Sequence, residues 1–366
     1  MTSAFTHAHG RRVAVAGCGE WGRNIVRNFH ELGALGVVCD RCPDTQRAMS
    51  ERYGVPGRSF PDILEDDGID CVAITAPAEM HATLTREALA HDKHVFVEKP
   101  LALNATDAKD LCAMAEARGR CLMVGHLLRY HPAFRRLAEL VQGGGLGRLQ
   151  YIYSNRLNLG RFRREENALW DFAPHDISMI LALVGAMPEA VWAIGAHYFH
   201  KSLYDVTTSH LAFPDGINAH IFVSWLNPFK DQKLVVVGEA GMAVFEDSLP
   251  GPEKLLFYPH TVTRQEDVPS LERAEPEPLP YPDEEPLKAE CQHFLDSVTA
   301  GSPPRTDGRE GARVLTVLEA AQHAMETGHR VCPPAGEAPG VARDASPHPA
   351  AATLAPDAAV GANTRI

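Results

Sequence analysis

The chain has 366 residues, of which 45% are hydrophobic, which is enough material for about two domains with sizeable cores. Its formal net charge of −12 excludes a surface suited to nucleic acid or anionic membranes, and we expect neither as a partner. No apolar run reaches the roughly 18 residues of a membrane span.

The N-terminal segment has no apolar stretch typical of a signal peptide, so we expect a cytoplasmic protein whose eight cysteines are reduced. Cys39 and Cys42 have the spacing of a zinc-binding pair. No second pair of cysteines or histidines accompanies them at zinc spacing, so we expect no metal site.

Residues 11–126 alternate short apolar runs with helical patterns, which indicates βαβ units and a parallel sheet. We expect residues 1–10 to be a flexible arm. The predicted strands cover 11–19, 34–40, 68–77, 93–100 and 121–126, and the predicted helices cover 21–33, 45–54, 81–92 and 107–119.

After residue 126 the pattern changes to longer β runs, which are typical of an antiparallel sheet with one covered face. We expect a second domain over 127–332, an exposed acidic loop over 266–286, and a disordered Ala/Pro-rich tail over 333–366. The predicted strands cover 146–160, 190–199, 209–216, 217–226 and 232–247, and the predicted helices cover 131–144, 289–301 and 310–328.

A glycine motif follows the first predicted strand and opens the first helix. In a dinucleotide-binding turn, Gly17 permits the tight turn, Gly19 lets a pyrophosphate approach the backbone, and Gly22 lets helix and strand pack. Asp40 ends the second strand, where an acid binds the adenosine ribose hydroxyls of NAD. Arg41 is placed to meet the 2′-phosphate of NADP instead, so the sequence favours NAD and leaves NADP open.

The fourth predicted strand ends in Glu98-Lys99-Pro100. Ligands of open parallel sheets bind outside the carboxyl ends of the strands, so Lys99 is at the correct edge to donate a proton or stabilise an alkoxide. A surface lysine at a strand end is the alternative interpretation.

Asp171 and His175 lie four residues apart in a predicted helix, where their side chains share one face. They could converge on one substrate. The alternative is an ordinary helix start, with Pro174 in the first turn and Asp171 near the N-cap.

These features together resemble the Gfo/Idh/MocA oxidoreductase family, over roughly residues 12 to 332. The resemblance rests on GCGEWG after the first strand, VEKP after the fourth and WDFAPHD further along, with supporting matches at 75–81, 125–132 and 308–328. It implies a Rossmann domain followed by an α/β domain with a large, mostly antiparallel open sheet, and assembly into homodimers or homotetramers.

The resemblance also implies roles for individual residues. Lys99 and His175 would be the catalytic pair, supported by Asp171, with one group orienting the substrate and the other taking its hydroxyl proton. The remaining residues implied near the cofactor are Glu20, Trp21, Thr75, Pro77, His81 and Glu98.

An arginine-rich segment over 155–164 precedes the proposed catalytic helix. It could clamp a diphosphate or carboxylate, or it could be a solvated turn or an oligomer contact. The candidate substrate-binding residues are Arg129, Arg156, Asn158, Arg161, Arg163 and Trp170, together with Asp171 and His175.

Many family members have a glycine run before the Asp–His pair, whereas this chain has REENALW. The segment resembles the nucleotide-sugar 3-dehydrogenase branch, which implies oxidation of UDP-N-acetylglucosamine or its uronic acid in lipopolysaccharide or surface-glycan synthesis. A dehydrogenase of a free sugar, inositol or glycoside is one alternative, and a non-catalytic NAD-binding regulator is another.

Overall fold

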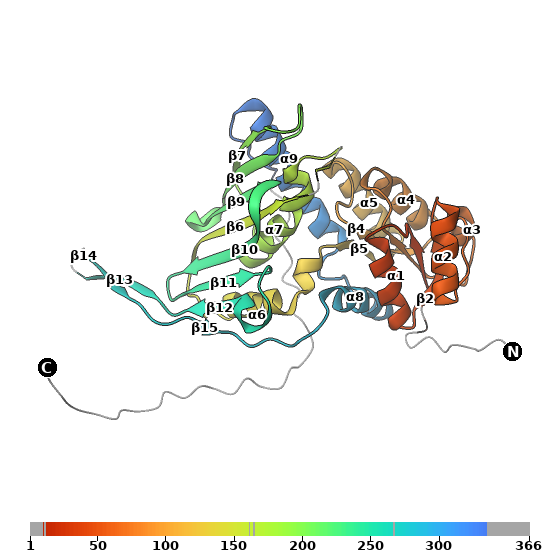
Figure 1. Ribbon diagram of the computed structural model, residues 1–366, viewed down its shortest axis with the longest axis horizontal. Helices are drawn as coiled ribbons and strands as arrows, with labels where there is room; N and C mark the ends of the chain where they lie inside the picture. Colours follow the sequence, from red (N-terminus) through yellow and green to blue (C-terminus); the bar gives the residue numbers. More distant parts are fainter. Residues whose placement is uncertain (1–9, 11, 161, 164, 266–267, 335–366) are drawn as a thin grey trace, which may run out of the picture.

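The computed structural model describes residues 10, 12–160, 162–163, 165–265 and 268–334 (Figure 1). Apart from Gly10, the predicted arm over 1–10 lies outside the described residues. The same holds for Arg161 and for the predicted tail from residue 335 onward.

The N-terminal part is a parallel sheet of five strands in the order β2-β1-β3-β4-β5, as the alternating sequence pattern predicted. The strands are buried because helices cover the sheet (Figure 1). The chain runs from β1 to β2 on one side of the sheet and then crosses to β3 on the other side of β1. This reversal creates a switch point between β1 and β3, where sheets of this kind bind ligands. The elements are β1 (Val13–Ala16), α1 (Gly22–Glu31), β2 (Leu35–Cys39), α2 (Pro43–Tyr53), α3 (Phe60–Leu64), β3 (Cys71–Ile74), α4 (Ala78–Ala90), β4 (His94–Glu98), α5 (Ala105–Ala117) and β5 (Leu122–Gly125).

The second sheet has eight strands in the order β15-β12-β11-β10-β6-β9-β8-β7, all antiparallel except for the β6–β9 pair. One face packs on α6, α7 and α9, while the other presents side chains such as Trp192 and Ile194 to solvent. Its elements are α6 (Pro132–Gln142), β6 (Leu149–Leu159), α7 (Ala168–Val184), β7 (Ala190–Ala196), β8 (Val206–Ala212), β9 (Asn218–Ser224), β10 (Leu226–Gly238), β11 (Met242–Glu246), β12 (Leu255–Tyr258) and β15 (Glu277–Pro278).

Two C-terminal helices return to the first sheet. Helix α8 (Pro286–Ala300) packs against α1, where Phe294 meets Phe29 and Phe96 edge to face at centroid distances of 6.3 and 5.9 Å. Helix α9 (Gly308–Thr327) packs on α5 of the first part and on α7 of the second (Figure 1). The core is therefore shared across residue 126, and the domain boundary at that residue stays a prediction.

The segment predicted as an exposed loop over 266–286 contains strands, so this prediction is wrong in part. β13 (Thr261–Gln265) and β14 (Val268–Glu272) form a separate hairpin that projects from the end of the large sheet (Figure 1). Val262 and Leu271 are paired and exposed. Because this apolar pair stays in solvent, it does not mark a buried face of the kind by which a strand is recognised in the sequence.

None of the helices in the described part of the chain is long and apolar enough to cross a membrane. All eight cysteines are free thiols. Among the described residues, no group of three His, Cys, Asp or Glu side chains is arranged to hold a metal ion.

Candidate active site

The glycine turn between β1 and α1 is shaped by contacts that exclude side chains at two of its three glycines. Gly17 has φ +98°, and a Cβ there would lie 2.7 Å from the amide nitrogen of Ala76. A Cβ at Gly22 would lie 2.1 Å from the Gly17 carbonyl oxygen. At Gly19, by contrast, a Cβ would meet no atom within 4 Å. The protein's own packing therefore requires Gly17 and Gly22, while Gly19 leaves open space suited to the pyrophosphate of a dinucleotide.

Asp40 follows β2 and braces this turn. One carboxylate oxygen accepts the amide of Cys18 at 2.6 Å, and the other accepts the amide of Cys42 at 2.8 Å. The carboxylate thus stands beside the glycine turn, the place where a ribose hydroxyl would reach it. Arg41 and Glu20 are exposed near the same edge.

Residues after β3 tie the neighbouring turns together. The Thr75 hydroxyl donates to the Gly17 carbonyl, and Pro77 occupies the N-cap position of α4. The buried His81 ring lies between the carbonyl oxygens of Ala76, at 2.8 Å, and Pro100, at 2.7 Å. Burial lowers the pKa of His81. These contacts make His81 a brace between the turns after β3 and β4.

The end of β4 contacts the start of α1. The Trp21 indole donates to a Glu98 carboxylate oxygen at 2.6 Å, and that carboxylate lies 3.0 Å from where a Cβ of Gly125 would be. Burial raises the pKa of Glu98. Trp21 itself remains exposed at the glycine turn, where a bound cofactor could contact it.

Lys99 meets the second part of the chain directly. Its ammonium donates to the backbone carbonyl of Asp171 at 2.8 Å, and the Lys99–Pro100 peptide bond is cis. The carboxylate of Asp171 accepts the indole N–H of Trp225 at 3.1 Å and the guanidinium of Arg163 at 3.2 Å. Three segments far apart in sequence therefore converge at the carboxyl edge of the parallel sheet.

His175 lies one turn further along α7 and is half-buried. Its Nδ1 atom is buried without a hydrogen-bond partner among the described residues. Burial, and then the positive charge of Lys99, hold the pKa of His175 well below its ordinary value. The imidazole is therefore neutral near pH 7, and a ring nitrogen of a neutral imidazole can accept a hydrogen bond from a substrate hydroxyl.

The alternative helix start is correct for Asp171, which lies near the N-cap, but wrong for Pro174: the helix begins at Ala168, so Pro174 lies inside it and not in its first turn. Asn167 is the N-cap, and its side chain accepts the amide of Trp170 at 3.1 Å. Asp171 lies in the first turn beyond it, with its carboxylate turned toward Arg163 and Trp225.

Two of the predicted substrate-binding arginines have buried partners. Arg156 forms a two-point ion pair with Asp176, at 2.7 and 3.0 Å. Arg129 donates to the Ser178 carbonyl at 3.2 Å and lies 3.5 Å from Glu310. Both guanidinium groups are committed to the packing of α7, and the structure does not bring them together as an open clamp.

The other predicted substrate-binding residues are placed differently. Arg163 keeps 47% of its side chain exposed while it contacts Asp171, and Asn158 and Trp170 are half-buried. Arg161 lies outside the described residues. The sequence analysis missed Trp225, which is fully buried. Its only sequence signal is a tryptophan at the end of a β run.

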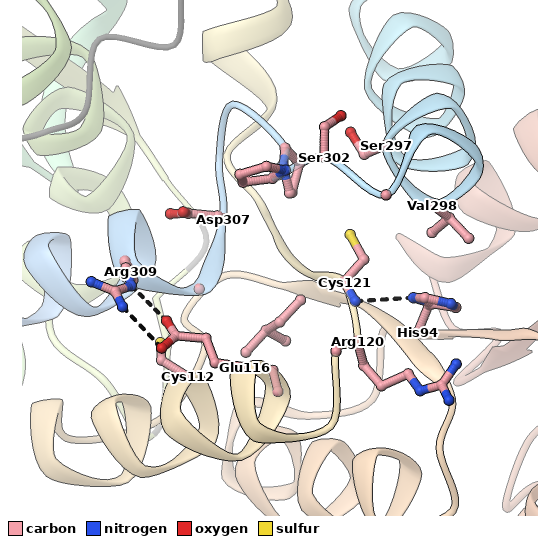
Figure 2. Close-up of a pocket in the computed structure, with 17 residues that line it drawn as sticks. His94, Cys112, Glu116, Arg120, Cys121, Ser297, Val298, Ser302, Asp307 and Arg309 are labelled. Atoms are coloured by element: carbon pink, nitrogen blue, oxygen red, sulfur yellow. Dashed lines mark hydrogen bonds and ion pairs between the residues drawn. The ribbon is translucent and has the colours of Figure 1, made fainter.

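A separate cavity of about 310 Å³ lies at the opposite, amino edge of the parallel sheet (Figure 2). Its lining includes His94 at the start of β4, Cys121 before β5, and an ion pair between Arg309 and Glu116. None of the predicted site residues lines this cavity.

Comparison with known protein families matches two models to the chain. Residues 11–126 match the oxidoreductase family model with an NAD-binding Rossmann fold, and residues 134–244 match the GFO/IDH/MocA C-terminal domain. The chain belongs to the GFO/IDH/MocA family. It is therefore an NAD-binding oxidoreductase, and the predicted family and fold class are confirmed.

Individual GFO/IDH/MocA relatives span nearly the whole chain. A UDP-N-acetylglucosamine 3-dehydrogenase of Acidithiobacillus ferrooxidans is 27% identical over 320 residues, covering 86% of this chain and 97% of the relative. Its solved structure superposes with a TM-score of 0.75 at 25% identity, covering 86% of this chain and 97% of that one.

Relatives with other activities are similar to a comparable degree. A myo-inositol 2-dehydrogenase of Thermotoga maritima is 26% identical over 337 residues, covering 86% of this chain and 96% of the relative. A levoglucosan dehydrogenase in complex with NADH and L-sorbose has a TM-score of 0.77 at 18% identity, covering 89% and 99% of the two chains, and shows the shared fold.

Proposed function

We propose that this protein is an NAD-dependent dehydrogenase that oxidises a secondary alcohol of a nucleotide sugar, at C3 of UDP-N-acetylglucosamine or its uronic acid. The observation that carries the proposal is the contact between the Lys99 ammonium and the Asp171 carbonyl, one helical turn before His175, at the edge of the sheet where the glycine turn lies. The similarity to a UDP-N-acetylglucosamine 3-dehydrogenase over most of both chains supports this substrate class.

Each of these side chains has a distinct role in the proposed reaction. The neutral imidazole of His175 accepts the proton of the substrate hydroxyl. The Lys99 ammonium spends one donor on the Asp171 carbonyl and has others to stabilise the oxygen as it loses its proton. NAD, when bound, supplies the hydride acceptor for this chemistry.

Asp171 positions these groups. One of its carboxylate oxygens accepts a hydrogen bond from Arg163 and the other accepts one from Trp225, while its backbone carbonyl accepts one from Lys99. Hydrogen bonds of this kind fix the orientation of a carboxylate. The start of α7 is thereby held against the end of β4.

The test is the rise in reduced-nicotinamide absorbance when the purified protein and NAD are mixed in turn with UDP-N-acetylglucosamine, its uronic acid, glucose and myo-inositol. A rise with a UDP-sugar alone supports the proposal. A rise with myo-inositol alone favours the second candidate, an inositol dehydrogenase, which the Thermotoga relative supports. A rise with glucose alone indicates a free-sugar dehydrogenase.

Variants connect the activity to the proposed residues. Lys99→Ala and His175→Ala should each abolish turnover and leave NAD binding intact, whereas Lys109→Ala, an exposed change on α5, should alter neither. Near-normal activity in either of the first two variants would show that the assigned role is wrong.

The resemblance further leads us to propose a cytoplasmic homodimer or homotetramer that acts in surface-glycan synthesis. Sedimentation analysis and cell fractionation test the first two properties. Loss of a surface glycan after gene deletion tests the third.

A further inference from the structure

A run of aromatic rings leads from the Asp171 carboxylate to the protein surface. Trp225 donates to Asp171 and is fully buried. Phe162 packs edge to face on Trp225, with ring centroids 5.7 Å apart. Phe199 then packs on Phe162 at 4.6 Å, with the planes tilted by 36°, and leaves 69% of its surface exposed. One end of this run holds the proposed site, and the other end presents an aromatic ring to solvent.

The loop that carries Phe199 is held in place by a buried carboxylate. One oxygen of Asp205, which is fully buried, accepts the successive amides of Tyr198, Phe199 and His200 at 2.6, 2.7 and 3.3 Å. The carbonyl of Asp205 in turn accepts the amide of Trp225 at 3.0 Å. Burial of a carboxylate costs free energy, and here its hydrogen bonds fix a loop whose own aromatic side chains stay outside the core. A loop fixed in this way is preorganised to meet a ligand.

The surroundings of these rings combine apolar surface with the guanidinium of Arg163. Leu159 and Leu226 pair across β6 and β10, and both are exposed. Arg163 follows Phe162 in the chain, and about half of its side chain is exposed. Exposed apolar residues grouped beside a catalytic group mark a binding surface, and a guanidinium pairs well with phosphate oxygens.

We propose that Phe199 and Phe162 form an outer subsite that stacks the nucleobase of the substrate, while Arg163 faces its phosphates. The planar base of a nucleotide would stack on the exposed Phe199 ring, and its diphosphate would pair with the guanidinium of Arg163. A free sugar or inositol has neither an aromatic ring nor a charge to use these groups. This inference rests on the proposed function, because it assigns the part of a nucleotide sugar that does not react.

The deciding comparison is Phe199→Ala against Tyr198→Ala. Tyr198 is the adjacent residue, is 76% exposed and is held by the same Asp205, so its variant controls for the loss of an exposed aromatic from this loop. Removal of a ring that stacks on a base weakens binding by a factor of about ten. For Phe199→Ala we expect KM for the UDP-sugar and Kd for UDP alone to rise roughly tenfold, with kcat nearly unchanged. Tyr198→Ala should match the wild type in all three values.

Equal KM and equal UDP affinity in Phe199→Ala and the wild type would overturn the outer subsite, provided that the wild type oxidises a UDP-sugar. A change of sedimentation coefficient in Phe199→Ala without a change in KM would also overturn it, and would indicate that this loop contacts a second copy of the chain. Failure of the proposed function looks different: the wild type would then oxidise only a free sugar and would not bind UDP. Thermal unfolding of each variant checks that the fold is retained.

Discussion

Replacement of Asp176 by alanine should strongly destabilise the fold, because it strands the charge of Arg156 inside the protein. The Asp176 carboxylate accepts hydrogen bonds from the Ser154 hydroxyl at 2.6 Å and from the Arg156 guanidinium at 2.7 and 3.0 Å. Hydrogen bonds to a charged group contribute about 1.5–3 kcal/mol each, so the sum over these three bonds is an upper bound on the decrease in the free energy of unfolding. Breaking a buried pair by removal of one partner costs about 3–5 kcal/mol, which is the decrease expected in the free energy of unfolding.

Urea unfolding followed by intrinsic fluorescence measures this loss as a lower midpoint. The matched control is the double variant Arg156→Met with Asp176→Leu, because an apolar pair of similar size removes both charges and leaves the stability within about 1 kcal/mol of the wild type. A loss below about 1 kcal/mol in Asp176→Ala would refute the reasoning. A double variant that is destabilised as strongly as Asp176→Ala would also refute it, since the loss would then not come from the stranded charge of Arg156.

Three further outcomes follow from the geometry. Trp225→Phe keeps a buried aromatic ring but removes the N–H that donates to the Asp171 carboxylate. The value of kcat should therefore fall roughly tenfold or more, while the NAD affinity measured by fluorescence titration stays unchanged. An unchanged kcat would show that this hydrogen bond does not contribute to catalysis. Gly19→Ala should fold normally and bind NAD weakly. Gly22→Ala should be destabilised, because its Cβ would lie 2.1 Å from the Gly17 carbonyl oxygen. Equal thermal stability of the two variants would contradict these separate roles of Gly19 and Gly22. Burial lowers the pKa of His131 from 6.5 to about 4. Below pH 6.5 the unfolded chain therefore binds a proton that the folded protein does not, so stability should fall between pH 6.5 and 4, and His131→Asn should flatten that slope in urea titrations at each pH.

Much of the architecture is encoded locally. Each strand of the first sheet is a short apolar run, because helices bury it, and the turn after β1 carries glycines that its own packing requires. Such signals lie within a few residues of one another, so fold class and family could be predicted from the sequence. The β13–β14 hairpin was missed because exposed strands that pair only with each other leave no burial pattern.

The candidate site also combines features that local sequence motifs predicted with contacts that only the tertiary structure shows. Motif and spacing were enough to single out Lys99 and the Asp171–His175 pair separately, because each lies in a recognisable local pattern, and only the family resemblance implied that they act together. Only the tertiary structure showed which atoms meet: the ammonium contacts the backbone carbonyl of Asp171, and the side chain of Asp171 turns to Trp225, 54 residues further along the chain.

Arg156 and Arg163 show why the local sequence could not predict which arginines are available to a substrate. In the sequence, Arg156 and Arg163 are equivalent members of one basic segment. In the fold, strand β6 points Arg156 into the core, where Asp176 neutralises it, while Arg163 lies beyond the strand and keeps about half of its side chain exposed. Composition, periodicity and short motifs therefore determined the fold class and the cofactor turn, and pointed to candidates for the reacting groups. The tertiary structure decided which charges are buried and which remain available, because burial depends on partners that lie far away in the chain.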